Sequence, residues 1–358
     1  PSSLGSLTLL EELELPSKCL TGTLPSSLGL LTLLKELHLM VNSLSGPLPA
    51  SLGSLTALTM LALYSNRFTG PLPGAQGKWA MLVALHLQEN SFTGLLPVAY
   101  ASMTGLVYMD VSANALTGAL PPELCKLDQL GTLAVASNGL TGPLPSVLAS
   151  LERLDHLLLG ANSLTGPLPT SLGLFSGLKA LNLSANALTG ALPRALGCLR
   201  RLTQLDLSAN VFTGPIYTDI GSSSALRELY MGENRLAGRV PSELGTMSNL
   251  GVLALESNAL TGPVPQSLCG SLRALSHIRL YQNRLTGLLP LIGEGCPALY
   301  SFDASANSFS GTLPVALYPA SFSVAGNPLG GALPAAANYS ALSAIDVSDT
   351  QIGEEEPS

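Results

Sequence analysis

The side chains of this chain that are able to ligate a metal or act as nucleophiles are few and widely spaced. The histidines are His38, His86, His156 and His277, and the cysteines are Cys19, Cys125, Cys198, Cys269 and Cys296. Catalysis requires a nucleophile within reach of a base, or several ligands around one metal ion. The sequence contains no Gly-rich nucleotide loop, kinase signature, HExxH or CxxC motif. We therefore predict that the chain is not an enzyme, has no catalytic or metal-ligating residues, and uses no cofactor.

Composition excludes several classes of partner. The 358 residues are 46% hydrophobic and 11% charged, with a net charge of −7, whereas ordinary globular domains are about 25% charged. An acidic chain lacks the basic surface that nucleic acids require, so we expect no nucleic-acid partner. The uncharged stretch 130–151 is interrupted by Asn138, glycines and prolines, and a spanning helix needs about 20 predominantly apolar residues. We predict no membrane-spanning segment in this chain.

One asparagine recurs along the chain at a step of 24 residues, and this repeat organises everything else. The series is Asn42, Asn66, Asn90, Asn114, Asn138, Asn162, Asn186, Asn210, Asn234 and Asn258, continued with small slips by Asn283, Asn307 and Asn327. Lys18 and Thr350 occupy the same slot at the two ends. We predict one domain over residues 1–358, with about fifteen ~24-residue repeats and irregular terminal repeats over 315–358. The opening PSSLGSL matches the second half of a repeat, so the first repeat is truncated and we expect residues before Pro1.

The repeat unit reads L-x-x-L-x-L-x-x-N-x-L-T-G-x-L-P-x-x-L-G-x-L. Its LxL part alternates apolar and polar residues, which predicts a short strand with inward leucines. The asparagine ends the strand with a buried amide that pairs with backbone groups. Glycine after threonine predicts a turn, and xxLGxL predicts a 3₁₀ return. Because one coil cannot bury its leucines alone, the fold class is an α/β repeat solenoid with a concave parallel β-sheet.

The unit resembles the plant-type leucine-rich repeat, with LTGPLP or LTGALP after the asparagine. The prevalence of Leu and Ala resembles green-algal versions. The resemblance implies a right-handed superhelix with short 3₁₀ or helical returns on its convex side. It also implies a family of extracellular recognition modules: receptor-kinase ectodomains, receptor-like proteins and polygalacturonase-inhibiting proteins. Paired cap cysteines of the family are not visible, and in SFSVAGNPLGG (321–331) Gly330 stands where the terminal cysteine would be.

Large polar and aromatic residues gather at two places among the outward positions of the predicted concave strands. Tyrosine and arginine are the residue types that most often anchor interfaces. The predicted binding patch comprises Arg227, Tyr230, Glu233, Glu256, His277, Arg279, Tyr281, Tyr300 and Asp303. A secondary patch comprises His38, Tyr64, His86 and Gln88. An ordinary solvated strand face is the alternative interpretation of both.

Several other residues carry narrower predictions. Asn182 and Asn338 begin N-x-S sequons and are glycosylation candidates. Cys269 and Cys296 fall on adjacent coils, so they form either a disulfide or a pair of buried free thiols. Trp79 takes a leucine slot of the repeat and is expected in the core.

These observations predict a non-enzymatic recognition or scaffold module that binds a protein, peptide or glycan on its concave face. We expect it outside the cell or on its surface, and as part of a larger assembly. One alternative is a structural subunit of an extracellular or appendage assembly. Another is ice binding by a file of threonines, although a single file is not a flat array and hydroxyls that cap a turn explain the slot equally well. That file is Thr21, Thr69, Thr93, Thr117, Thr141, Thr165, Thr189, Thr213, Thr261 and Thr286.

Overall fold

The computed structural model describes residues 2–73, 79–314, 319–333 and 342–353. Its coils group into two compact units, Pro1–Asn186 and Ala187–Ser358, which we describe separately. Residues 315–318 and 334–341, within the predicted irregular terminal repeats, lie outside the described part. The single-domain organisation stays a prediction.

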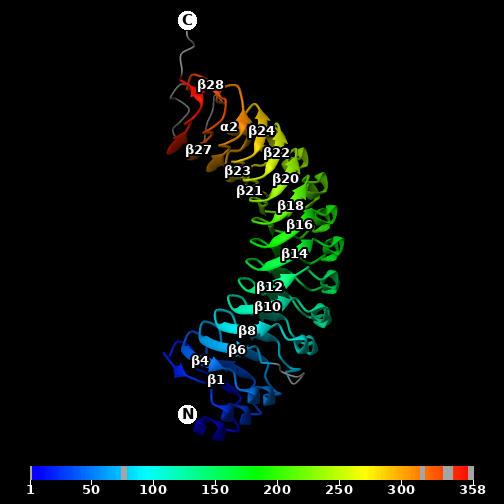
Figure 1. The fold of residues 1–358 in the computed structure, drawn as a ribbon, viewed down its shortest axis with the longest axis vertical. Helices are drawn as coiled ribbons and strands as arrows, with labels where there is room; N and C mark the ends of the chain where they lie inside the picture. Colours follow the sequence, from blue (N-terminus) through cyan, green and yellow to red (C-terminus); the bar gives the residue numbers. More distant parts are fainter. Residues whose placement is uncertain (1, 74–78, 315–318, 334–341, 354–358) are drawn as a thin grey trace. The chain divides into compact units, whose positions relative to one another are not determined.

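Each unit contains a parallel sheet with one three-residue strand per coil, on its concave side (Figure 1). In the first unit the strands are β1 (Glu12–Glu14), β3 (Glu36–His38), β5 (Met60–Ala62), β7 (Ala84–His86), β9 (Tyr108–Asp110), β11 (Thr132–Ala134), β13 (His156–Leu158) and β15 (Ala180–Asn182). In the second unit they are β17 (Gln204–Asp206), β19 (Glu228–Tyr230), β21 (Val252–Ala254), β23 (His277–Arg279), β25 (Ser301–Asp303), β27 (Ser321–Ser323) and β29 (Ala344–Asp346). The predicted concave parallel sheet is confirmed.

These strands form because apolar and polar residues alternate in the LxL part of the repeat. In β13, Leu157 is fully buried while His156 and Leu158 on either side are partly exposed. The register aligns leucine with leucine, so that Leu133 lies opposite Leu157. The sheet therefore presents its middle residue to the core and its first and third residues to the concave surface.

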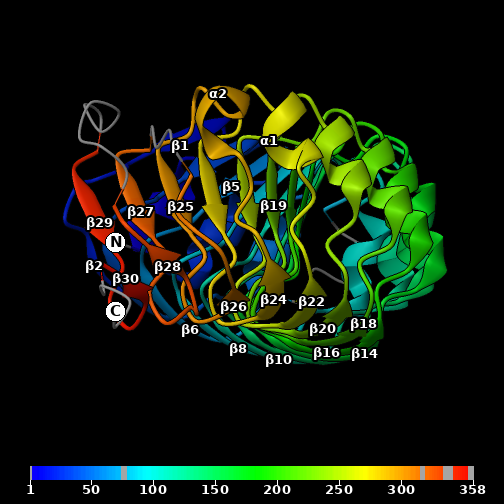
Figure 2. The same cartoon turned by 90° about the horizontal axis from the view of Figure 1, so that it is seen from above.

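A second parallel sheet runs through the Leu-Thr-Gly segment, where the sequence predicted a turn. In the first unit it contains β2 (Thr21–Gly22), β4 (Ser43–Pro47), β6 (Arg67–Pro71), β8 (Ser91–Leu95), β10 (Ala115–Ala119), β12 (Gly139–Gly142) and β14 (Ser163–Pro167). In the second unit it contains β16 (Ala187–Ala191), β18 (Val211–Gly214), β20 (Arg235–Gly238), β22 (Ala259–Gly262), β24 (Arg284–Gly287) and β26 (Ser308–Phe309), and the short pair β28 (Gly330–Gly331) and β30 (Gln351–Ile352) follows. Figure 2 shows β8, β10 and β14 along one edge of the first unit.

The turn prediction was wrong because this segment also alternates. In β14, Leu164 is buried while Ser163 and Thr165 are exposed, which is the pattern of a half-buried strand. Gly166 follows with φ of +79°, a value that glycine adopts without strain. The threonine file therefore faces outward from a sheet and does not cap a turn.

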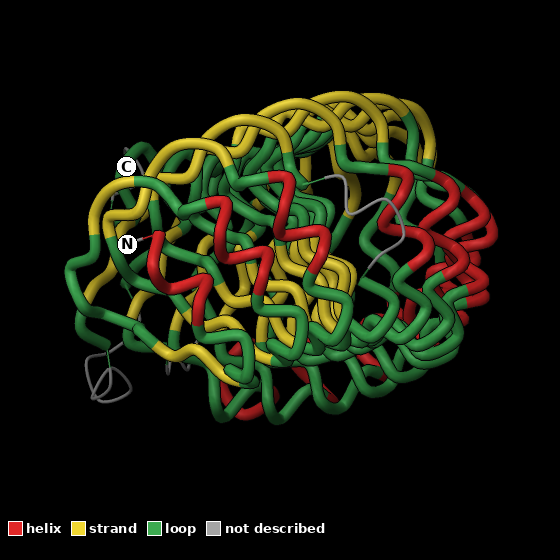
Figure 3. Tube along the Cα trace, turned by 90° about the horizontal axis from the view of Figure 1, so that it is seen from below, coloured by secondary structure: helices red, strands yellow, loops and turns green. Residues whose placement is uncertain are grey.

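The xxLGxL segment forms short helical turns, as predicted, and these turns stack on their own side of the coils (Figure 3). The 3₁₀ turns of the first unit are η1 (Ser2–Ser6), η2 (Ser26–Leu30), η3 (Ala50–Ser54), η4 (Val98–Ser102), η5 (Pro122–Lys126), η6 (Ser146–Ser150) and η7 (Thr170–Leu174). The second unit has η8 (Arg194–Cys198), η9 (Thr218–Ser222) and η10 (Ser242–Thr246), followed by the short α-helices α1 (Ser267–Ser271) and α2 (Ile292–Gly295). Most of these turns contribute a leucine or isoleucine to the core, such as Leu172, whereas η4 contributes Tyr100.

The repeat asparagine joins adjacent coils through its side chain, which confirms its predicted role. Asn162 Oδ1 accepts a hydrogen bond from the backbone N–H of Leu140 at 3.0 Å. Its Nδ2 donates to the carbonyls of Val135 at 3.1 Å and Leu159 at 3.0 Å. The preceding residue, Ala161, has φ of +52°, so the chain turns sharply into this position. One amide thus satisfies backbone groups of two coils where the strand ends.

Candidate functional site

The preferred site lies on the concave sheet of the second unit, across β19, β21 and β23. The sheet places outward residues of neighbouring coils beside one another: Tyr230 pairs with Ala254, and Ala254 pairs with Arg279. Glu256 and Tyr281 occupy the next outward position beyond the ends of β21 and β23. Because Ala254 is small, the side chains around it define the surface.

Glu256 is the most unusual group of this surface. It is 8% exposed, and within the described residues its Oε2 is buried without a hydrogen-bond partner. Burial raises the pKa of the Glu256 carboxyl; a backbone hydrogen bond and Arg279 oppose this, whereas Glu233 and Asp303 act in the same direction as burial. An unpaired buried carboxylate oxygen is costly in the free protein, so it marks a place where a ligand donor would be stabilised.

A glycine makes room for this carboxyl group. Gly232 occupies the corresponding position of the preceding coil, and a Cβ there would lie 2.6 Å from Glu256 Cδ and Oε1. Any side chain at residue 232 would therefore displace Glu256. The sequence shows this glycine, but its contact with Glu256 depends on how the two coils stack.

Two tyrosines of this surface have raised pKa values, and Tyr281 is influenced by Glu256 directly. Burial raises the pKa of Tyr230 first, and the neighbouring Glu228 raises it further. The Tyr230 hydroxyl donates a hydrogen bond of 3.4 Å to Glu228 Oε2. Burial also raises the pKa of Tyr281, with Glu256 as the next cause and Arg279 opposing. Glu228 also belongs to the site, at the first position of β19, although it is not among the residues predicted from the sequence.

The remaining predicted residues divide between this centre and its margin. Glu233 and Asp303 influence the pKa of Glu256 and belong to the centre. His277 and Tyr300 form a separate pair, with ring centroids 5.7 Å apart, near the start of the strands. Arg227 lies at that same margin, where its carbonyl accepts a hydrogen bond from the N–H of Gly251.

The secondary patch of the first unit is an aromatic file. The ring centroids of Tyr64 and His86 are 6.3 Å apart, and those of His86 and Tyr108 are 4.5 Å apart in a stacked arrangement. Burial lowers the pKa of His86, the nearby His38 adds to this, and Asp110 opposes it. Tyr108, at the first position of β9, is a member of this file that was not predicted from the sequence.

The other two members of the secondary patch have different neighbours. His38 Nε2 lies 2.9 Å from Glu36 Oε2. Gln88 Oε1 is buried and has no hydrogen-bond partner in the described part of the chain. Like Glu256 Oε2, it is a polar atom that the protein itself leaves unpaired.

The predictions for single residues have different outcomes. Trp79 is fully buried, as predicted, and its Nε1 donates to the Leu52 carbonyl at 3.1 Å. Asn182 ends β15 and its Oδ1 accepts from the Ser184 hydroxyl at 2.7 Å, whereas Asn338 lies outside the described residues. Cys269 and Cys296 are buried free thiols, and a hydrogen bond between them together with burial raises the pKa of Cys269. Among the helices that the structure describes, none is long and apolar enough to cross a bilayer.

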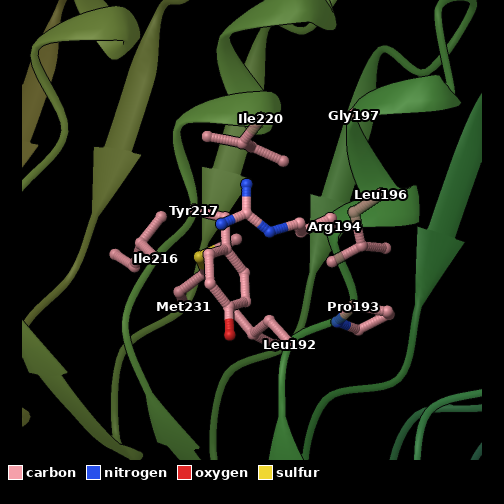
Figure 4. Close-up of a pocket in the computed structure, with 9 residues that line it drawn as sticks. All are labelled: Leu192, Pro193, Arg194, Leu196, Gly197, Ile216, Tyr217, Ile220 and Met231. Atoms are coloured by element: carbon pink, nitrogen blue, oxygen red, sulfur yellow. The ribbon is translucent and has the colours of Figure 1, made fainter.

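A second candidate site is the small pocket between η8 and η9 (Figure 4). The Arg194 guanidinium lies over the Tyr217 ring at 4.5 Å and pairs with Asp219 at 2.8 Å. Its other lining residues are apolar or glycine: Leu192, Pro193, Leu196, Gly197, Ile216, Ile220 and Met231. Because Arg194 is engaged by both the ring and the carboxylate, we interpret this pocket as packing between two turns.

Comparison with known proteins identifies relatives of the whole repeat array. A family model described as a leucine rich repeat matches residues 152–212. The chain is similar to the plant peptide hormone receptor RGFR1, solved in complex with RGF2, at 29% identity and a TM-score of 0.93, over 100% of this chain and 58% of that one. It is similar to a TDR receptor at 30% identity and a TM-score of 0.89, over 99% of this chain and 67% of that one.

A relative of a different kind also appears. A plant ice-binding protein is 29% identical, with a TM-score of 0.60, over 69% of this chain and 82% of that one. A search of the curated proteins returned no match. Because the chain spans 58% of the RGFR1 chain, the activity of that receptor as a whole does not carry over to it.

Proposed function

Because the chain belongs to the plant-type leucine-rich repeat family, we propose that it is a non-enzymatic recognition module that binds an extended peptide or protein segment. The segment lies across the concave sheet of the second unit, at Glu256, Tyr281 and Tyr230. The relative RGFR1 is a peptide hormone receptor, which supports this class of ligand. A module of this class works outside the cell, within a larger assembly.

The observation that carries the proposal is the buried oxygen Glu256 Oε2, which has no hydrogen-bond partner among the described residues. Glu228, Glu233 and Asp303 add negative charge around it, while Arg279 supplies a positive one. The preferred ligand therefore carries a lysine or arginine, whose N–H groups donate to Glu256. Arg279 is exposed and moves aside when the ligand cation arrives, and the two tyrosine rings pack against the apolar part of the ligand side chain.

Selection from a random-peptide display library tests this site. We expect enriched peptides to contain a basic residue, and Glu256→Gln to weaken their binding at least tenfold, because a hydrogen bond between charged groups contributes about 1.5–3 kcal/mol. Tyr281→Ala weakens binding as well. Glu152→Gln, which removes an exposed carboxylate from the other unit, is the matched control and leaves binding unchanged.

Two outcomes contradict the proposal. One is enrichment of peptides without basic residues. The other is equal binding by the wild type and Glu256→Gln, measured by calorimetry on a selected peptide. Melting temperatures of the variants show that the fold is retained.

A second candidate function is ice binding by the second sheet of the first unit. Thr117, Thr141 and Thr165 are exposed and face outward from neighbouring strands. Their register is staggered, because Thr141 pairs with Ala119 and Ser163 and not with the other two threonines. Ser163 and Pro167, in the same strand as Thr165, are exposed as well, so the exposed hydroxyl groups of this surface are not limited to the threonine file. The similarity to a plant ice-binding protein supports this alternative.

Measurement of thermal hysteresis tests the ice-binding alternative. The double variant Thr141→Lys and Thr165→Lys places two long charged side chains on this surface and abolishes any hysteresis that the wild type has. Thr104→Lys, at an exposed site in a loop, is the control and retains it. Wild-type hysteresis of zero rejects ice binding.

A further inference from the structure

Two glutamates and a histidine meet across the first two strands of the concave sheet. Glu14 in β1 lies directly opposite His38 in β3. Glu36 is two residues before His38, so both side chains leave the same face of β3. One ligand atom from each of Glu14, Glu36 and His38 lies within 4.8 Å of the other two. This cluster belongs to the first unit and shares no residue with the peptide site.

The burial of the three groups suits an ion held at the sheet surface. His38 is 9% exposed, whereas Glu36 is half-buried and Glu14 is exposed. The imidazole is therefore positioned by packing, and the outer carboxylate is able to move. Ala62 takes the position of His38 on the next strand, and its methyl group leaves space beside the imidazole.

The local charges favour a cation. Glu12 lies directly opposite Glu36, and like charges facing each other across two strands are destabilising. Lys35 is engaged by Glu11 at 2.5 Å, at the edge of the strands. A divalent ion between Glu14 and Glu36 would neutralise the charges of these two carboxylates.

The ligand geometry is close to that of a metal site. Ligands about 2.0–2.2 Å from a zinc ion stand about 3.3 Å apart around a tetrahedral centre. The 2.9 Å separation of His38 Nε2 and Glu36 Oε2 is similar, and a rotamer change of exposed Glu14 closes the wider gaps. One imidazole nitrogen and two carboxylate oxygens suit a first-row divalent metal better than calcium or magnesium, which prefer oxygen alone.

We propose that Glu14, Glu36 and His38 bind a zinc ion that joins β1 to β3. Three protein ligands leave a fourth position on the concave side for water or for an acidic group of a partner. This proposal departs from the expectation of no metal ligands, because the strand register places Glu14 beside His38.

Calorimetric titration of untagged, chelator-treated protein with zinc chloride tests the site. We expect one equivalent of zinc to bind, and His38→Ala and Glu14→Gln each to weaken binding at least tenfold. Glu14→Gln alters an exposed residue and leaves the His38–Glu36 pair in place, so it keeps the test valid if His38→Ala fails to fold. His156→Ala and Glu11→Gln are the matched controls, which remove a histidine or a carboxylate outside the cluster and bind zinc as the wild type does.

Hydrogen exchange gives a second readout. Zinc slows exchange at the amides of β1 and β3 in the wild type and has no such effect in Glu14→Gln. The proposal is overturned by the absence of saturable zinc binding at millimolar concentration, or by Glu14→Gln binding zinc like the wild type. Tighter binding of calcium than of zinc also overturns the proposal. Calcium prefers oxygen ligands alone, so that result would show that the imidazole of His38 is not a ligand.

Discussion

At the scale of single residues, the asparagine of each repeat is the main link between coils. Asn162 satisfies the N–H of Leu140 and the carbonyls of Val135 and Leu159 at once. The two carbonyls follow the strands of the concave sheet, and the N–H of Leu140 belongs to β12. The side chain therefore adds to the backbone hydrogen bonds between coils, such as that from the Ala161 N–H to the Ser184 carbonyl.

We predict that Asn162→Ala lowers the free energy of unfolding by about 3 kcal/mol, because each unsatisfied buried polar group costs about 1–3 kcal/mol. Urea denaturation measures the loss. Asn249→Ala removes an exposed asparagine that makes a single hydrogen bond to Ser224, and its cost stays within about 0.5 kcal/mol. Equal costs for the two variants would show that the buried amide has no special role.

Glu256 makes stability depend on pH in an unusual direction. Burial holds the pKa of its carboxyl above the ordinary value of 4.5 in the folded protein, so the folded state binds this proton more tightly than the unfolded state does. Stability from this group is therefore fully present below the unfolded pKa, and it is lost as the pH rises through the folded pKa.

We predict that Glu256→Gln is more stable than the wild type at pH 7, by on the order of 1 kcal/mol, and that the difference disappears near about pH 4. Thermal melting across this range measures it. Glu152→Gln, at an exposed site, shows no such crossover. A Glu256→Gln variant that is less stable than the wild type at pH 7 contradicts the unpaired state of the carboxylate.

At the scale of elements, the glycines of the repeat have two different structural roles. Gly166 lies in β14 with φ of +79°, and the nearest atom to an added Cβ is Pro143 Cβ at 3.6 Å. Gly197 lies in η8, where an added Cβ would meet the Asp219 carbonyl oxygen of η9 at 2.1 Å. The first glycine permits a backbone conformation, and the second permits close stacking of helical turns.

We therefore predict that Gly197→Ala destabilises the protein by about 3 kcal/mol, since backbone must shift to relieve overpacking. Gly166→Ala costs about 1–2 kcal/mol, the penalty of a left-handed conformation for an L-residue. Chemical denaturation of both variants checks the order. The opposite order would mean that adjacent turns are loosely stacked.

At the scale of the whole molecule, the compartment decides the state of the cysteine pair. Cys269 in α1 and Cys296 directly after α2 are buried and hydrogen-bonded to each other. An extracellular protein meets oxidising conditions that a cytosolic one does not. The pair is thus placed to form a disulfide between adjacent coils if the protein is exported.

We predict that refolding with oxidised glutathione joins Cys269 to Cys296, with transfer of two electrons to glutathione and loss of two protons. Peptide mapping without reductant detects the cross-link, and Cys269→Ser removes it. Recovery of both residues as free thiols after refolding would favour the alternative of two buried cysteines.

By itself, the sequence determined the repeat, the concave strands, the helical returns, the asparagine links and a core that includes Trp79. These features follow from the alternation of side chains and from backbone hydrogen bonding within one coil, which are local and recur in every copy. The Leu-Thr-Gly strand was misread because glycine suggests a turn, although the residues before it alternate. The outward positions of the preferred patch were also predictable, since strand geometry alone assigns them.

Only the tertiary structure decided which of those outward groups meet. Glu256 Oε2 is buried without a hydrogen-bond partner among the described residues, and the carboxyl group lies where a Cβ on Gly232 of the preceding coil would stand. His38 meets Glu14 because β1 and β3 pair in that register. Both arrangements depend on side-chain conformations and on neighbours 24 or more residues away in the sequence. The sequence of a single coil does not reveal such contacts.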